Sequence, residues 1–357
     1  MVHTPIPSHR QAGFSIVEMM IGLVIGMIAI IVMMQVFSVS EGYKRTTTGG
    51  DDAQTHGALA LYAIQRDMRQ SGIGASSSEI IGCNVTLRPG VTLNTMAPVT
   101  INHASIPVGA GPSAAVGDTL LAFYGNGPGS GEGEKVQAKP SLASYTIPAA
   151  APSASAPGAF AVGDQVVAQF QPRPAPCNLA MEPVTAIAGT TVSVATGAAN
   201  NLGILFNLGQ APKVLAYAVR AGNLTVCDYI ANDCSVAGSV ANTAIWVPVA
   251  SNIVSLRAEY GRDTTAPMDG TVDAFDQTAP ANACDWSRIS AVRFALVARN
   301  SELDKASVTT AAPTWAAGAS APIDLTADAN WQNYRYKTFQ TIVPLRNMAW
   351  QGAQSGC

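Results

Sequence analysis

One acidic residue stands at the edge of the longest apolar run of the chain. Glu18 follows the sequence Gly13-Phe14-Ser15-Ile16-Val17, and residues 19–34 carry no polar side chain. A charge within a membrane-spanning helix costs roughly 2.5–3.5 kcal/mol on insertion scales. The isolated carboxylate therefore indicates a function, and it predicts an interaction partner for Glu18.

Residues that commonly catalyse reactions are few. His3 and His9 precede the apolar run, His56 follows it, and His103 lies further along the chain. No recognisable nucleophile motif lies near His103, so a Ser-His-Asp or Cys-His site is not indicated. We expect His103 to be a solvated loop residue, the chain to be no enzyme, and no cofactor to be bound.

An acidic loop spans residues 263–276 and contains Asp269, Asp273 and Asp276. Oxygen ligands at such spacings can bind calcium, but the EF-hand order of acids, glycine and a terminal glutamate is missing. We therefore interpret the loop as a solvated turn and expect no metal site.

Six cysteines follow the apolar run, at positions Cys83, Cys177, Cys227, Cys234, Cys284 and Cys357. An even number of cysteines in an exported region suggests disulfides. Only Cys227 and Cys234 are suggested as a pair by proximity, because they close a short loop. Two free buried thiols, or bonds to more distant cysteines, remain open alternatives.

The apolar run is long enough to cross a membrane. Residues 14–37 form 24 positions, about 36 Å of helix against ~30 Å of hydrocarbon. A secretory signal peptide has its small-residue cleavage site after the apolar core, whereas here the small residue, Gly13, precedes it. We therefore predict a retained spanning helix. Arg10, Lys44 and Arg45 flank it on both sides, so the positive-inside rule does not decide its orientation.

Residues 38–72 predict an amphipathic continuation of this helix. Small and apolar side chains recur near helical spacing on one face, namely Ala53, Ala60, Ile64 and Met68. Asp67 lies largely outside this stripe. Gly49-Gly50 predicts a break or bend, and Gly72 suits the C-terminal cap.

From residue 75 onward the pattern favours strands. Apolar or alternating runs cover residues 119–124, 165–170, 214–219, 224–227, 254–260, 292–299 and 334–343. Residues 214–229 predict a hairpin with its turn near Gly222-Asn223. Between the first two runs, residues 125–163 are rich in Gly, Pro, Ala and Ser, a composition that predicts a surface excursion without a core.

Composition limits the class of protein. The chain has 20 basic and 23 acidic side chains, and only 12% of its residues are charged. Without residues 1–13 the net charge is −4, which argues against a nucleic-acid partner. Abundant glycine and proline predict a loop-rich, β-rich head. The fold class expected is α+β, with a long hydrophobic helix packed on a mainly antiparallel head.

The sequence Gly13-Phe14-Ser15-Ile16-Val17-Glu18 and the apolar helix after it resemble the class III signal of type IV pilins and type II secretion pseudopilins. The resemblance implies that a prepilin peptidase cuts between Gly13 and Phe14 and methylates the amine of Phe14. Glu18 becomes the fifth residue and pairs with a terminal amine during assembly, which compensates a costly buried charge. A plain signal anchor with a snorkelling Glu18 is the alternative.

Four later stretches, residues 68–72, 254–263, 289–299 and 334–347, are similar to the PilW family of type IV pilus minor pilins. The resemblance implies a leader at 1–13, an assembly helix at 14–37, a stalk continuation at 38–72 and a head at 73–357. The implied function is that of a minor pilin that primes pilus assembly near the tip.

The implied partners are other minor pilins, the major pilin, the prepilin peptidase and a tip adhesin. The implied location is the inner membrane, crossed once with the head in the periplasm, and then the pilus. A minor pseudopilin of the J type is the first alternative. A membrane-anchored exported enzyme or binding protein is the second, and it would keep an uncut N-terminus.

Overall fold

The computed structural model describes residues 13, 15–129, 131–148, 159–198 and 202–349. The chain divides into two compact units, residues 1–51 and residues 52–357, and each is described by itself. Helix α1 (Ile16–Gln70) supplies most of the first unit and the first element of the second. It continues without interruption through Gly49-Gly50, so the predicted break there is wrong. A helical glycine costs only about 1 kcal/mol relative to alanine, which a long helix tolerates.

The end of α1 follows the predicted capping pattern. The Ser71 N–H donates to the carbonyl of Asp67 at 3.1 Å, and Gly72 adopts φ +89°. Glycine is favoured at this left-handed position because it has no Cβ to clash. The Gly72 N–H then donates to the carbonyl of Phe123 at 2.9 Å, which connects the end of the helix to a strand of the head.

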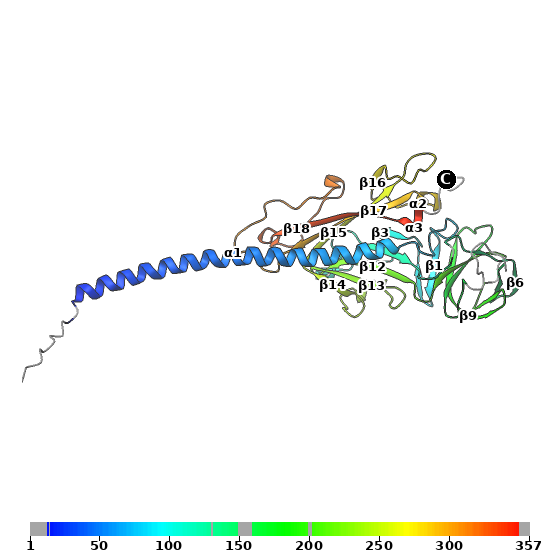
Figure 1. The fold of residues 1–357 in the computed structure, drawn as a ribbon, viewed down its shortest axis with the longest axis horizontal. Helices are drawn as coiled ribbons and strands as arrows, with labels where there is room; N and C mark the ends of the chain where they lie inside the picture. The colour runs from blue at the N-terminus through cyan, green and yellow to red at the C-terminus, as the bar shows by residue number, and fades with distance from the viewer. Residues whose placement is uncertain (1–12, 14, 130, 149–158, 199–201, 350–357) are drawn as a thin grey trace, which may run out of the picture. The chain divides into compact units, whose positions relative to one another are not determined.

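Within the described residues, the head contains three β-sheets, labelled in Figure 1. The nine-stranded sheet comprises β1 (Asn84–Arg88), β2 (Val91–Leu93), β5 (Glu134–Lys135), β6 (Ala138–Ser141), β7 (Ser144–Thr146), β8 (Gln165–Phe170), β9 (Asn178–Ala188), β10 (Thr191–Val194) and β11 (Gly203–Gly209). The five-stranded sheet comprises β3 (Val99–Ile101), β4 (Leu120–Tyr124), β12 (Lys213–Arg220), β13 (Asn223–Asp228) and β14 (Val247–Ser251). The four-stranded sheet comprises β15 (Ile253–Arg262), β16 (Ala274–Asp276), β17 (Ile289–Arg299) and β18 (Tyr336–Pro344). The short helices are α2 (Ala283–Ser287), α3 (Arg346–Ala349), η1 (Gly111–Ser113), η2 (Ala237–Ser239), η3 (Gly318–Ser320) and η4 (Trp331–Asn333).

The five-stranded sheet is antiparallel, in the order β14-β13-β12-β4-β3. Strands β12 and β13 form the predicted hairpin, turned by Ala221 and Gly222 at φ +48° and +73°. Two positive φ values are typical of the type I′ turn, whose twist suits a hairpin. Lys213 at the start of β12 pairs with Tyr124 at the end of β4. Residues 125–212 therefore connect two neighbouring strands of one sheet.

That connection contains most of the nine-stranded sheet, in the order β5-β11-β8-β9-β10-β7-β6. Its pairings are antiparallel except for β1 with β9, which run parallel. Figure 1 shows β1, β6 and β9 grouped at one end of the head.

The expectation that residues 125–163 bury no core is wrong for the described part of this stretch. Val136, Tyr145, Ile147 and Phe160 are each at most 7% exposed, and they pack with β8, β10 and β11 in a separate hydrophobic cluster. The local composition is poor in apolar residues, but a few isolated ones are brought together by pairing with strands far along the chain.

The second part of α1 packs on antiparallel sheet, as the change of period predicted. Its stripe of Ala60, Ile64 and Met68 is fully buried. The stripe shares a core with Leu256 of β15 and Phe294 of β17, and Phe339 of β18 packs against that core. Burying one Leu, Ile or Met side chain contributes about 1.5–3 kcal/mol, so this face holds the helix to the head.

Candidate assembly site and the joints of the head

The first turn of α1 is capped by a side chain. The Ser15 hydroxyl accepts a hydrogen bond from the Val17 N–H at 3.3 Å, and the Ser15 carbonyl accepts from Met19 at 3.1 Å. Serine is a preferred N-cap because its oxygen satisfies a helix N–H that has no intrahelical partner. Gly13, just before the cap, is exposed, whereas Phe14 lies outside the described residues. The helix therefore begins two residues after the predicted cleavage point.

Glu18 is exposed in the first turn of α1, three residues after the cap. A carboxylate at this position interacts favourably with the positive end of the helix dipole. The local structure thus accounts for an acid early in the helix. The helix dipole does not explain why the acid stands directly before a wholly apolar stretch. If that stretch enters a membrane or packs among other helices, the carboxylate of Glu18 loses its hydration, which is costly without a partner.

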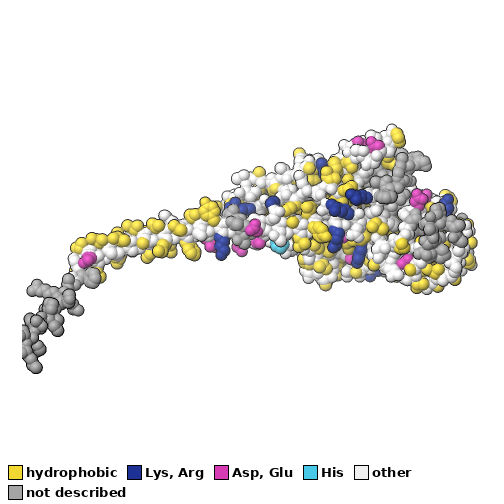
Figure 2. Space-filling view, in the orientation of Figure 1, with side chains coloured by type: hydrophobic (Ala, Val, Ile, Leu, Met, Phe, Trp, Pro, Cys, Tyr) yellow, Lys and Arg dark blue, Asp and Glu magenta, His cyan; other side chains and the backbone are white. Residues whose placement is uncertain are grey.

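Apolar side chains cover the face of the first part of α1 that Figure 2 shows. From Ile16 to Val39 the large hydrophobic side chains are at least 52% exposed. An 18-residue window of this helix has a mean hydropathy of 2.7, and none of it is buried within the protein. A helix that is apolar all round belongs in a membrane or among other helices. By length and composition this segment can cross a membrane.

The second part of α1 approaches its sheet closely because one position has no side chain. A Cβ on Gly57 would lie 2.0 Å from Cε2 of Phe339, which real structures do not tolerate. The stripe Ala53, Gly57, Ala60 thus lets the ring of Phe339 lie against the helix backbone. Small residues at successive turns set the distance between the helix and β18.

Asp67 forms a polar joint between α1 and the five-stranded sheet. Its carboxylate is fully buried and accepts hydrogen bonds from the hydroxyls of Tyr124 at 3.1 Å and of Tyr217. Arg66 donates to the same carboxylate at 2.9 Å, although its own side chain is 55% exposed. Burial and the negative charge of Asp67 raise the pKa of both tyrosines. Helical spacing alone placed Asp67 outside the buried stripe, because the spacing carries no information about Tyr124 and Tyr217, which contact Asp67 from the five-stranded sheet.

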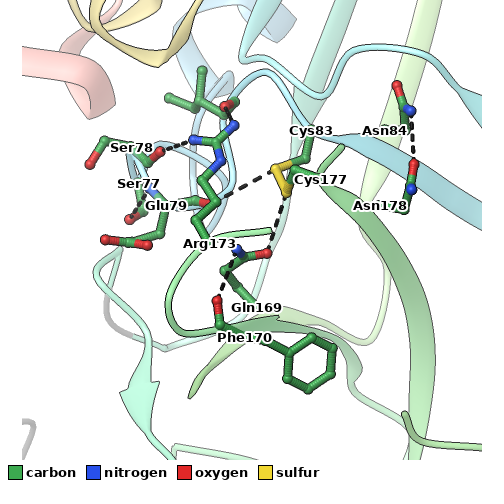
Figure 3. Close-up of a disulfide and its surroundings, with 11 residues drawn as sticks. Ser77, Ser78, Glu79, Cys83, Asn84, Gln169, Phe170, Arg173, Cys177 and Asn178 are labelled. Carbon is green, nitrogen blue, oxygen red and sulfur yellow. Dashed lines mark hydrogen bonds between the residues drawn. A yellow bond between two sulfur atoms is a disulfide. The ribbon is translucent and has the colours of Figure 1, made fainter. Parts of the chain in front are cut away.

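A disulfide between Cys83 and Cys177 joins segments 94 residues apart in the sequence (Figure 3). Beside it, the Arg173 guanidinium donates to the carbonyls of Ser78 at 2.6 Å and Ile81 at 2.8 Å. The bond lies where β1 and β9 begin their parallel pairing. It therefore fastens the long connection between β4 and β12 to the segment that follows α1. Sequence spacing gave no signal for this pair.

Cys227 and Cys234 are also joined, seven residues apart, which is the pair that proximity favoured. Cys227 belongs to β13, and both cysteines are buried. Cys284 is disulfide-bonded as well. Cys357 lies outside the described residues. No described cysteine is free.

Two Gly-Asp pairs open strands of different sheets in the same way. Gly117 and Gly163 both have positive φ, and the aspartates after them, Asp118 and Asp164, are buried. Asp118 accepts from the backbone N–H of Ala258 at 2.9 Å and so connects the five- and four-stranded sheets. Satisfied buried carboxylates of this kind fix loop geometry, since an unpaired one would cost several kcal/mol.

The residues considered for catalysis or metal binding have structural surroundings. His103 is 4% exposed, so its predicted solvation is wrong; its Nδ1 accepts from the Ser105 N–H at 3.1 Å, and burial lowers its pKa. In the acidic loop, Asp263 is buried and its carboxylate accepts from three backbone N–H groups, while Asp269 and Asp273 are exposed. Among the described residues, no group of three potential ligands is close enough to hold a metal ion.

Comparison with known proteins gives matches at both ends of the chain. The model of the prokaryotic N-terminal methylation motif matches residues 8–34. The family model described as Type IV Pilus-assembly protein W, or PilW, matches residues 226–347. A type IV-like pilin from Thermus thermophilus is a structural match at 10% identity, with a TM-score of 0.30, over 83% of this chain and 96% of that one. No curated protein matches.

The methylation motif and the apolar helix define a membrane-anchored, pilin-like protein that becomes associated with a pilus. The match at residues 226–347 narrows the class: together with the methylation motif it supports a type IV pilin-like minor pilin of the PilW type, the family that the sequence predicted. Such proteins are structural components of pili and not enzymes. Other pilins are its partners, and the motif makes it a prepilin peptidase substrate.

Proposed function

We propose that this minor pilin primes the assembly of type IV pili and sits at or near the pilus tip, in a complex with other minor pilins. The observation that carries the proposal is the composition of α1 from Ile16 to Val39: exposed apolar side chains throughout, with one carboxylate, Glu18, at the start. Such a helix is suited to pack among similar helices, and Glu18 is the one charged side chain among residues 16–39 that can select a partner.

Processing would supply that partner. Cleavage between Gly13 and Phe14 creates a terminal amine on Phe14, which the same peptidase methylates and which stays protonated at neutral pH. In the same chain this amine stands four residues before Glu18 in the sequence, and the amine of an adjoining pilin is the other candidate partner. In an apolar layer this pairing offsets part of the cost of burying either charge.

The size of the head favours an end position. The nine-stranded sheet precedes the segment matched by the PilW family model, and it adds a large body to the head. A subunit inside a filament must repeat the same contacts with neighbours on both sides, whereas a subunit at the end needs one set. Before assembly, the helix crosses the inner membrane once and the head lies in the periplasm.

Processing is tested by the intact mass of the protein from a pilus-assembling cell. Wild-type protein should begin with N-methylated Phe14. Gly13→Val should remain uncut, because a branched side chain does not fit a peptidase site that accepts glycine. A wild-type chain that starts after residue 37, or that stays uncut in a piliated cell, would contradict the proposal and favour the exported anchor protein.

The role of Glu18 is tested by Glu18→Ala, with Glu41→Ala as the control that removes a carboxylate from the same helix beyond the apolar run. We expect Glu18→Ala to reduce surface pili and incorporation of the protein at unchanged protein level, and Glu41→Ala to do neither. Normal piliation with wild-type incorporation of the Glu18→Ala protein would refute the role.

The priming complex is tested by co-purification of the full-length protein. Other pilus minor pilins should be recovered in amounts comparable to the bait, with the major pilin as a smaller fraction. Recovery of secretion pseudopilins instead, together with neighbouring genes for a secretion ATPase and an outer-membrane channel, would assign the chain to the J-type pseudopilins. Even distribution of the labelled protein along the pilus would exclude the tip position.

A further inference from the structure

A cavity of about 600 Å³ lies in the head where the five-stranded and four-stranded sheets meet. Its walls come from the loop at residues 111–117, the β12–β13 turn, the ends of β15, β17 and β18, and the segment at residues 322–328. Pro112, Asp324 and Ala327 in its lining are exposed, so the cavity reaches the surface. Its volume falls within the roughly 300–1,000 Å³ that is typical of small-molecule sites.

One wall is held in place by a buried arginine. Arg220 is 2% exposed and donates to the carbonyls of Val108 at 2.8 Å and Ser113 at 3.0 Å, and also to that of Pro107. Its guanidinium lies 4.6 Å from the ring centre of Trp246. The loop that forms this wall is therefore fixed without any ligand, and a pre-formed wall lowers the entropy cost of binding.

The parts of the lining that belong to β15 and β17 carry two paired arginines. Arg257 donates to Asp118 at 3.2 Å, and its side chain remains 18% exposed. Arg299 donates to Asp328 at 2.6 Å and lies 4.0 Å from the ring centre of Tyr334. These contacts fix the planes of both guanidinium groups.

The charges of the lining side chains cancel, because Arg257 and Arg299 face the same space as Asp324 and Asp328. An anion in the cavity would meet two carboxylates, with buried Asp118 as a third behind Arg257. A cation would meet two guanidinium groups. A hydroxyl group both donates and accepts hydrogen bonds, so it is compatible with both kinds of side chain.

The hydrogen bonds that these groups already form narrow the ligand further. Oδ1 of Asp324 already accepts from the Thr326 N–H and hydroxyl, which leaves its second oxygen as an acceptor for a ligand hydroxyl. The guanidinium N–H groups that are not bonded to Asp118 or Asp328 are the matching donors. Tyr336 adds an aromatic side chain to the lining. We propose that the cavity binds a neutral polyhydroxylated ligand, namely a sugar unit of a glycan. This inference is independent of the role in pilus assembly.

The test uses the full-length protein in a detergent without a sugar head group. Saturation-transfer NMR is recorded with glucose, galactose, mannose, N-acetylglucosamine and N-acetylgalactosamine, and with glucuronate, glutamate and lysine as charged probes. We expect transfer to at least one neutral sugar and weaker or no transfer to the charged probes. Ala327→Trp should abolish the signal by filling the cavity, whereas Ala241→Trp, at another exposed alanine that does not line the cavity, should leave the signal unchanged.

Asp324→Asn gives a second measure that keeps the side-chain shape and touches no buried charge. It should weaken the affinity for the same sugar roughly tenfold, the loss expected for one charge-assisted hydrogen bond. If Ala327→Trp does not fold, as judged by circular dichroism, this variant decides alone. The proposal is overturned if no neutral sugar gives transfer, if the decisive variant binds like wild type, or if only charged probes bind.

Discussion

The two parts of α1 belong to one helix but differ in whether their apolar side chains are buried within the protein. Before Asp52, the large apolar side chains remain more than half exposed. From Ala53 to Met68, one stripe of apolar side chains is buried within the head, and Leu59 and Tyr62 outside that stripe are exposed. An apolar stripe on one face of a helix can be buried by the sheets of the same chain. A helix that is apolar on all faces needs a membrane or several other helices to bury its side chains.

The glycines show the same contrast at the level of single atoms. A Cβ added to Gly26 would meet no atom within 4 Å, whereas one added to Gly57 would collide with Phe339. In the first part of the helix, the surface at Gly26 is open, so another molecule can approach the helix backbone closely there. In the second part, the ring of Phe339 already lies against the backbone at Gly57. The comparison predicts that substitutions in the two parts will separate assembly from stability.

The largest effect on stability is expected for Asp67→Ala. This variant leaves the buried hydroxyls of Tyr124 and Tyr217 without their charged acceptor, and it should cost about 3–5 kcal/mol of unfolding free energy. Urea unfolding of the full-length protein, followed by near-ultraviolet circular dichroism, measures it. Asp52→Ala is the control, because its bond to Ser301 is exposed and should contribute less than about 1 kcal/mol. Equal losses in the two variants would contradict a special role for Asp67.

A smaller loss is expected for Gly57→Ala. The new methyl group must displace the ring of Phe339, and overpacking of this kind costs about 1–3 kcal/mol, partly offset by about 1 kcal/mol of helix propensity. The matched variant Gly26→Ala gains the same propensity with no clash. It should leave the unfolding transition of the head unchanged. A more stable head in Gly57→Ala would show that the helix is not held as tightly as the contacts indicate.

Alkaline pH should weaken the joint at Asp67 gradually. The pKa values of Tyr124 and Tyr217 are raised in the folded protein by burial and by Asp67, so each stabilises fully below the unfolded pKa of about 10. Above that pH the unfolded state loses protons first, and stability falls by about 1.4 kcal/mol per pH unit for each tyrosine. The double variant Tyr124→Phe, Tyr217→Phe should be less stable at pH 7 but should decline less steeply between pH 10 and 11. Identical slopes for the two proteins would disprove the linkage.

The smallest effect on the head is expected for Glu18→Gln, which removes the charge and keeps the shape. Because Glu18 lies in the unit before the head, the unfolding free energy of the head should change by less than about 0.5 kcal/mol. Incorporation into pili should nevertheless fall. A lower unfolding free energy of the head in Glu18→Gln would mean that the first part of α1 contributes to the stability of the head, and that assembly and stability are not separated between the two parts.

The elements that could be predicted from the sequence are those whose signals are local. The helical stripe, the hairpin of β12 and β13, and the alternating strands β15 and β17 all carry their period in consecutive residues. The motif at Gly13-Phe14 and Glu18 is equally local, which is why it was recognisable without a structure. Cleavage, methylation and the pairing of Glu18 remain predictions.

The parts that could not be predicted depend on residues far apart in the chain. Cys83 and Cys177 meet only because β1 pairs with β9, and Asp67 is buried only because Tyr124 and Tyr217 lie above it. The glycine-rich connection looked too polar for a core, since Val136, Tyr145 and Phe160 are widely spaced. Composition averages over a window, whereas a core needs only that a few side chains converge.

The pairing of Lys213 with Tyr124 has a consequence for how this head can vary. Residues 125–212 leave and re-enter the five-stranded sheet at adjacent positions, in the place where a simple hairpin would have its turn. The entropic cost of closing a loop grows slowly with its length, so a longer or shorter connection at this position is compatible with the same pairing of β4 and β12. The disulfide between Cys83 and Cys177 and the pairing of β1 with β9 attach this connection to the segment that follows α1. A protein in which residues 125–212 were replaced could therefore keep the helix and the segment matched by the PilW model, but β1 would lose the strand with which it pairs.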